Sequence, residues 1–283
     1  MTSTRAMIVT RRTYNRPTNE DGTQFESWKD TVERVVEHQR WLWSRAIGHK
    51  NLTQDQEFEL EDLYELMMTR KATVSGRTLW LGGTRIARER EASQFNCSFL
   101  EVESVHDVVD ALWLLMQGCG VGFKAMPGIL NGFVKPMEIE VIRSKRKSKG
   151  KASNMESYEN GVWKIKIGDS AESWSKALGK MLASKYPADK LILDLSEIRP
   201  SGSRLKGYGW ISSGDDSISR SFPAIAKILN RKAGKLLDKI DILDILNWCG
   251  TILSSRRSAQ IALHDFNSSQ WEDFATAKKG FRP

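Results

Sequence analysis

From residue 95 onward, short strand patterns alternate with amphipathic helix patterns, and this alternation limits the possible folds more than any other feature of the chain. Phe95, Cys97 and Phe99 are spaced to share one face of a strand. A helix pattern then runs from Ser104 to Gly118. Further strand patterns lie near 137–141, 191–195 and 258–263, and further helix patterns near 174–182, 242–253 and 271–279. Strands that alternate with helices of about ten to fifteen residues indicate parallel βαβ units. Because parallel strands need cover on both faces, an open doubly wound sheet and a barrel both fit this α/β pattern.

The segment before this alternation has a helical pattern. Ser27 followed by Asp30 resembles a capping signal for a helix that carries Trp28 and Trp43 on its apolar stripe. A second amphipathic helix is predicted from the apolar residues Phe58, Leu63, Leu66 and Met67. We expect the tryptophans to be core residues of a helical region that precedes the α/β part.

The charge balance favours polyanionic partners. The net charge is +8 and the pI is about 9.3, which suits nucleic acid, nucleotides or phosphorylated small molecules. Much of the excess lies in the run 143–151, which lacks apolar periodicity and is predicted to be an exposed loop. The loop could be merely solvated, or it could contact phosphates. Since no segment is long and apolar enough for a membrane span or a signal-peptide core, we expect a soluble, cytoplasmic protein.

The three cysteines differ in their settings. None belongs to a C-x-x-C pair, which argues against a thiolate zinc site and a disulfide framework and favours a reducing compartment. Cys249 lies on an apolar helix stripe and is expected to be structural. Cys119 sits between glycines in a turn, where the backbone can approach a ligand. Cys97 would face either the core of its sheet or the interior of a barrel, and from its chemistry alone reactivity is the less favoured interpretation.

Two turns rich in arginine and glycine are also candidate anion sites. The turn 199–209 follows a strand that ends at Leu195, and ligands of α/β folds gather at the carboxyl ends of strands. The turn 254–258 contains the pair Arg256 and Arg257. Both turns could equally be surface connections. The four histidines show no ligand spacing, so no metal site is expected.

Five stretches together resemble one family. In chain order they are residues 72–80 (ATVSGRTLW), 96–99 (NCSF), 118–123 (GCGVGF), 191–200 (LILDLSEIRP) and 256–259 (RRSA). Their order and approximate spacing are similar to those of adenosylcobalamin-dependent (class II) ribonucleotide reductases, and most similar to the monomeric ribonucleoside-triphosphate reductases. The resemblance covers nearly the whole chain, from Arg12 onward.

The resemblance implies a fold and a set of domains. It implies a helical N-terminal region, residues 1–92, followed by about the first half of a ten-stranded α/β barrel, residues 93–283. The radical cysteine of the family, its second redox cysteine, its C-terminal cysteine pair and most contacts to adenosylcobalamin would lie beyond this chain. This part alone is therefore expected to be inactive.

The resemblance also implies roles for particular residues. Cys97 matches one of the two thiols that supply electrons for reduction of the ribose 2′-carbon. The residues that match segments binding the substrate are Ser75, Asn96, Cys119, Gly120, Arg256 and Arg257. The residues that match the loop relaying the identity of a bound effector are Ser254, Ser255, Ser258 and Gln260. The stretch 209–214 departs from the family pattern, so a substrate or cobalamin contact there is altered.

The partners implied are the C-terminal half of the reductase, a ribonucleoside triphosphate, a deoxynucleoside triphosphate effector and thioredoxin or a similar reductant. Two alternatives remain. One is a fragment of the large subunit of a di-iron (class I) reductase, which shares the fold. The other is a basic nucleic-acid-binding α/β protein that uses residues 143–151. Nucleic acid is the less favoured partner because that run has no interleaved aromatic residues for base stacking.

Overall fold

The computed structural model describes residues 3–19, 21–48, 51–205, 207–208, 210–253, 260–277 and 279. The chain divides into two compact units. The first, here the helical unit, comprises residues 1–96 with 205–210. The second, here the α/β unit, comprises residues 97–204 with 211–283.

The helical unit is built from short helices around a small apolar core. Its helices are α1 (Thr4–Thr13), α2 (Trp28–Ile47), α3 (Gln54–Met68), α4 (Gly76–Leu81), α5 (Arg85–Glu89) and the 3-10 helix η1 (Glu91–Gln94). Val32 and Val35 of α2 are fully buried with Met67 of α3 and Leu79 of α4. Apolar positions on successive turns of α2 thus hold this unit together.

The predicted start of α2 is confirmed. The Ser27 hydroxyl accepts a hydrogen bond from the Asp30 amide at 3.2 Å, and the Asp30 carboxylate accepts from the Ser27 amide at 2.8 Å. This reciprocal pair satisfies two amides that a helix N-terminus leaves without partners within the helix. Thr53 and Gln56 form a second capping box at the start of α3, which the sequence analysis did not identify.

The predicted apolar stripe of α3 is partly wrong. Phe58 is 54% exposed and Leu66 is 41% exposed, whereas Leu60 and Met67 are buried. Trp28 of α2 is half-buried against the same core, and its indole Nε1 donates to the Met67 carbonyl at 3.0 Å. Helix α3 is therefore amphipathic, as predicted, but its buried face is rotated about the helix axis relative to the predicted one.

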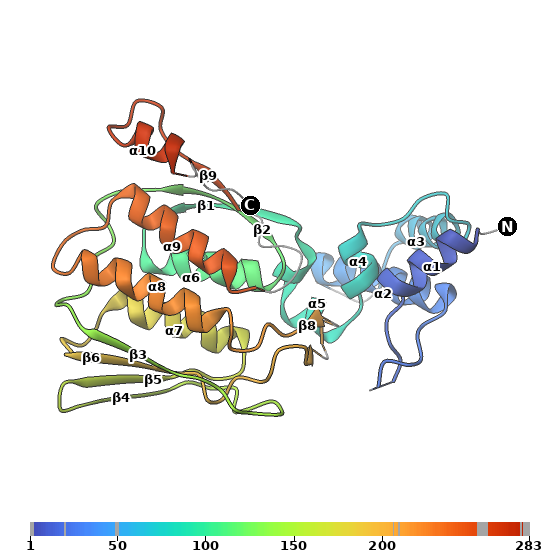
Figure 1. The fold of residues 1–283 in the computed structure, drawn as a ribbon. Helices are drawn as coiled ribbons and strands as arrows, with labels where there is room; N and C mark the ends of the chain where they lie inside the picture. The colour runs from blue at the N-terminus through green and yellow to red at the C-terminus, as the bar shows by residue number, and fades with distance from the viewer. Residues whose placement is uncertain are drawn as a thin grey trace. The chain divides into compact units, whose positions relative to one another are not determined.

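In the α/β unit, two separate sheets enclose a layer of helices (Figure 1). The parallel sheet has the order β1-β2-β9, with β1 (Cys97–Val102), β2 (Gly120–Ala125) and β9 (Gln260–Leu263). The mixed sheet has the order β3-β6-β5-β4, with β3 (Glu138–Ile142), β4 (Met155–Glu159), β5 (Val162–Lys166) and β6 (Lys190–Asp194). The enclosed helices are α6 (Val105–Met116), α7 (Ala171–Ala183), α8 (Ile218–Arg231) and α9 (Lys239–Thr251). The short helix α10 (Trp271–Thr276) follows β9 and lies outside this layer. Two further short strands, β7 (Arg204–Leu205) and β8 (Trp210–Ile211), pair with each other.

Parallel βαβ units are present, as predicted, but two of their strands, β2 and β5, were not predicted, and the predicted strands do not all join one sheet. β1, α6 and β2 form one parallel unit, and β5, α7 and β6 form another. The strands near 137–141 and 191–195 pair with each other in the mixed sheet and not with β1 or β2. The part of residues 93–283 that the structure describes therefore forms open sheets. The half-barrel predicted for these residues is not seen there.

Two elements of the mixed sheet escaped the sequence analysis. β4 and β5 form an antiparallel hairpin across Asn160 and Gly161, whose φ angles are +49° and +76°. An Asn-Gly pair is the usual signal for such a turn, because both central residues need positive φ. Helix α8 was also missed, although it buries Phe222, Ile225 and Leu229 against the common core.

Candidate active site

Strand register brings three of the predicted site residues together at the amino ends of the parallel sheet. The Cα of Cys97, the first residue of β1, pairs with that of Gly120, the first residue of β2. One step along β2, Val121 pairs with Gln260, the first residue of β9. Residues far apart in sequence thus begin neighbouring strands at one edge of the sheet.

The sulfur of Cys97 lies on the face of the sheet that is turned away from the helices. Cys97 is exposed, and Phe99 on the same face of β1 is 54% exposed. On the opposite face, Val102, Val121 and Phe123 are buried in the core that contains α6 and α9. Of the two orientations predicted for Cys97, the one toward the core of the sheet is therefore wrong.

The turn before β2 presents backbone rather than a thiol. Gly118 has a φ of +87°, which favours glycine, and reverses the chain after α6. The Cys119 amide donates to the Leu114 carbonyl at 3.0 Å, and the Cys119 side chain is fully buried. Any ligand contact of Cys119 must come from its backbone.

The other predicted site residues are more scattered. Ser75 is the exposed N-cap of α4 in the helical unit, where its hydroxyl accepts from the Thr78 amide at 3.3 Å. Asn96 is exposed and directly precedes β1. Gln260 is described only in its backbone. The predicted residues that lie outside the described part of the chain are Ser254, Ser255, Arg256, Arg257 and Ser258.

The three cysteines should differ sharply in reactivity. Cys119 and Cys249 are fully buried, and burial raises the pKa of the Cys249 thiol to about 12. Because the thiolate is the nucleophile, iodoacetamide should modify the native chain at Cys97 only. Peptide mass spectrometry before and after denaturation checks this. Labelling of Cys249 as fast as Cys97 in the native chain would contradict it.

The predicted basic loop is confirmed as an exposed loop, and its arginines are held by acids. Arg143 donates through Nε to Asp215 at 2.7 Å and also pairs with Asp216. These hydrogen bonds raise the pKa of Arg143 above its ordinary value. Arg146 lies 3.0 Å from a carboxylate oxygen of Glu197. The ion pairs of Arg143 and Arg146 thus hold this loop against the rest of the α/β unit.

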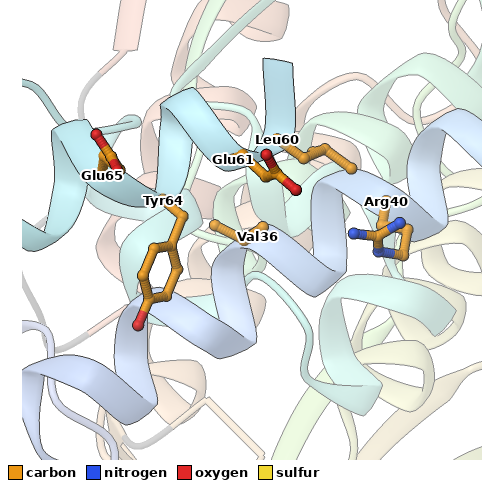
Figure 2. Close-up of a pocket in the computed structure, with 6 residues that line it drawn as sticks. All are labelled: Val36, Arg40, Leu60, Glu61, Tyr64 and Glu65. Atoms are coloured by element: carbon orange, nitrogen blue, oxygen red, sulfur yellow. The ribbon is translucent and has the colours of Figure 1, made fainter. Parts of the chain in front are cut away.

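Two hollows of the surface lie away from Cys97. One, of about 340 Å³, lies between α2 and α3 (Figure 2). Its lining residues are Val36, Arg40, Leu60, Glu61, Tyr64 and Glu65. The Arg40 side chain there donates to Glu57. The other, of about 380 Å³, is lined in part by Val105, Phe133 and Ser184 in the α/β unit. Neither is lined by a predicted site residue.

The described ranges contain neither a metal-binding cluster nor a membrane-spanning helix. No group of three or more His, Cys, Asp or Glu side chains there could hold a metal ion. No helix within those same ranges is long and apolar enough to cross a membrane.

Comparisons with known proteins agree on one family. Residues 3–84 match the ribonucleotide reductase alpha domain, and residues 141–229 match the insertion domain of B12-dependent ribonucleotide reductase. The insertion-domain match spans the region from the end of β3 into α8, which includes most of the mixed sheet.

Proteins that resemble this chain over nearly its whole length share one description. The adenosylcobalamin-dependent ribonucleoside-triphosphate reductase of Lactobacillus gasseri is 28% identical over 96% of this chain and 42% of its own length. The protein with that description from Euglena gracilis is 30% identical over 94% of this chain and 36% of its own length. A solved B12-dependent (class II) ribonucleotide reductase is 27% identical and superposes with a TM-score of 0.77 over 97% of this chain and 43% of its own. The chain thus spans about 42% of the length of the Lactobacillus gasseri protein. It belongs to the adenosylcobalamin-dependent, class II family of ribonucleotide reductases and spans a part of the length of its members.

Proposed function

We propose that the chain is the N-terminal part of a ribonucleoside-triphosphate reductase, with Cys97 as one of its two redox thiols. The observation that carries this proposal is the position of Cys97. In a chain of this family, its exposed sulfur lies beside Gly120 at the amino ends of three parallel strands. A thiol on a free sheet face can meet a substrate, whereas the two buried cysteines cannot.

The proposed reduction of the ribose requires a second cysteine thiol in addition to Cys97. The ribose 2′-carbon loses its hydroxyl as water and gains hydrogen. The two thiols together give up two electrons and two protons and become a disulfide. Thioredoxin or a similar dithiol then reduces the disulfide by exchange. Because Cys119 and Cys249 are buried, the second thiol would come from the rest of the reductase.

The remaining site residues have supporting roles in this proposal. Gly120 would contribute backbone contacts to the substrate. Because the Cys119 amide already donates to the Leu114 carbonyl and its thiol is buried, Cys119 would act only by shaping this turn. Ser75 and Asn96 are proposed as further contacts to the phosphates and ribose of the substrate. Arg256 or Arg257 would reach the substrate from the loop that reads a deoxynucleotide effector, to which Ser254, Ser255, Ser258 and Gln260 also belong. The net charge of +8 would draw these anions in.

The barrel of the family would be only partly supplied by this chain. We propose that β1, β2 and β9 contribute barrel strands, after a helical region of residues 1–92. The mixed sheet would belong instead to the insertion, because the insertion-domain match covers most of it. Residues 93–283 would then hold both a part of the barrel and this insertion.

The described residues do not by themselves fit adenosylcobalamin. Of the two surface hollows found among these residues, neither is lined by Cys97 or by its strand neighbours Phe99 and Gly120. When bound, the cofactor would supply the radical that starts the reaction. We propose that its contacts lie mostly in the remainder of the reductase, so the chain alone would be inactive.

Replacing Cys97 tests the proposal. The chain is combined with the C-terminal half of the reductase, adenosylcobalamin, a ribonucleoside triphosphate and thioredoxin, and deoxynucleotide is measured. We expect Cys97→Ser to abolish thioredoxin-dependent turnover, because serine cannot form the disulfide. Cys249→Ala, which also removes one thiol, should retain turnover. Equal turnover in the Cys97→Ser and Cys249→Ala proteins would refute the role of Cys97.

The alternatives have less support. The relatives named above are B12-dependent, which favours class II over a di-iron reductase. For nucleic-acid binding, the ion pairs of Arg143 and Arg146 leave fewer charges in residues 143–151 for phosphates.

A further inference from the structure

The exposed face of the parallel sheet is arranged in three rows that cross the strands. The first row contains Cys97 and Gly120, and it is the row of the proposed site. The second contains Phe99, Gly122 and Ile261, and the third contains Glu101, Lys124 and Leu263. Successive rows are about 6.6 Å apart, since side chains on one face recur every second residue of a strand.

The second row contains no polar side chain, and two of its residues, Phe99 and Gly122, are in close contact. A Cβ built on Gly122 would lie only 2.8 Å from Cδ2 of Phe99, so the phenyl ring rests directly on the Gly122 backbone. Only glycine leaves room for the ring in that position. Ile261 lies on the other side of Gly122 and is 70% exposed. Phe99 and Ile261 thus form an apolar bar across β1, β2 and β9.

Two of the three residues in the third row, Glu101 and Lys124, are charged. Lys124 lies 3.5 Å from a carboxylate oxygen of Asp265, and Glu101 occupies the paired position on β1. The apolar bar therefore lies between the thiol of Cys97 and these charged, hydrated groups. The Phe99 ring lies on Gly122, one row away from Cys97 and Gly120.

We infer that Phe99 is a positioning residue, which rests on Gly122 and forms the wall that confines the substrate's ribose over Gly120 beside Cys97. This inference rests on the proposed function. The wall does two things. It stops the sugar from sliding along the strands toward Lys124, and it separates the reacting thiol from the charged side chains of Glu101 and Lys124.

Alkylation of Cys97 tests the wall without any turnover. The chain is treated with iodoacetamide, a small reagent, and with a bulky aromatic maleimide, and the two rates at Cys97 are compared. A wall beside the sulfur hinders the bulky reagent more, so Phe99→Ala should raise the ratio of bulky to small rates severalfold. Phe99→Leu should give an intermediate ratio.

Phe58→Ala is the matched control, because Phe58 is also 54% exposed but lies in the helical unit. It should leave the ratio unchanged. The buried Cys119 and Cys249 report unfolding in the same samples, since they react only when the fold opens. A Phe99→Ala ratio equal to that of Phe58→Ala, with both buried cysteines unlabelled, would overturn the inference.

Turnover separates this inference from the proposed function. In the complete reductase, we expect Phe99→Ala to lower kcat by roughly tenfold to a hundredfold, with a smaller change in KM, because misplacement by about 1 Å has effects of that size. If Cys97→Ser abolishes turnover but Phe99→Ala retains full kcat, the inference fails and the proposed function stands. If Cys97→Ser remains active, the proposed function itself fails.

Discussion

Trp163→Ala is expected to destabilise the α/β unit by about 3–5 kcal/mol, the usual cost of truncating a buried tryptophan. The Trp163 side chain is fully buried on β5. Its ring packs edge-on against Tyr186, with centroids 5.6 Å apart, and its Nε1 donates to Glu156 at 2.9 Å. The substitution would leave a cavity between the mixed sheet and the helices and would deprive the Glu156 carboxylate of a donor.

Urea unfolding followed by circular dichroism measures this effect. Trp248→Ala is the control, because Trp248 is 37% exposed on α9 and its loss should cost much less. Trp163→Phe should lie between the two, since it keeps a ring but loses the N–H donor. An equal loss of stability in the Trp163→Ala and Trp248→Ala proteins would show that Trp163 does not hold the mixed sheet to the helices.

Arg34→Met is expected to destabilise the helical unit by a similar amount, about 3–5 kcal/mol, because it breaks a buried ion pair and leaves one charge behind. The side chains of Arg34 and Glu26 are 15% and 13% exposed. Arg34 donates to both carboxylate oxygens of Glu26, at 2.7 and 2.9 Å, and to the carbonyls of Leu79 and Gly82. It therefore joins the start of α2 to the end of α4.

The control for Arg34 is an exposed pair on α5. Arg85 and Glu89 lie 3.1 Å apart with side chains that are 84% and 53% exposed. Arg85→Met should change the free energy of unfolding by at most about 1 kcal/mol. Comparable destabilisation by the two substitutions would indicate that burial of the Arg34 pair is unimportant.

The Arg34 effect should depend on pH. Burial would raise the pKa of Glu26, but the hydrogen bonds and charge of Arg34, with further donors at Arg16 and Thr31, outweigh burial and hold it below the ordinary 4.5. A carboxyl with a depressed folded-state pKa stabilises above its unfolded pKa, and this stabilisation is lost as pH falls through the folded value. The difference in stability between wild type and Arg34→Met should therefore shrink below about pH 4.5. Urea titrations on both sides of that pH measure it.

The candidate site was only partly predictable. Its core, Cys97 and Gly120, followed from matching short motifs in order, and the strand register then placed the two residues side by side. The contact of Phe99 with Gly122 has a weaker signal, the glycines at the first and third positions of β2, which became interpretable only once the register was known. The anchoring of Arg143 by Asp215 spans 72 residues and leaves no local pattern.

The sequence by itself determined the local elements. The capping box at Ser27 and the apolar spacing of α6 and α7 depend on neighbours within a few residues, so they could be read before any tertiary contact was known. Only the tertiary structure decided which strands share a sheet and which face of β1 stays free. β3 and β6 carry strand patterns much like that of β1, yet they pair in a separate sheet. Strand pairing and burial depend on packing between distant segments, and the same local pattern fits either sheet.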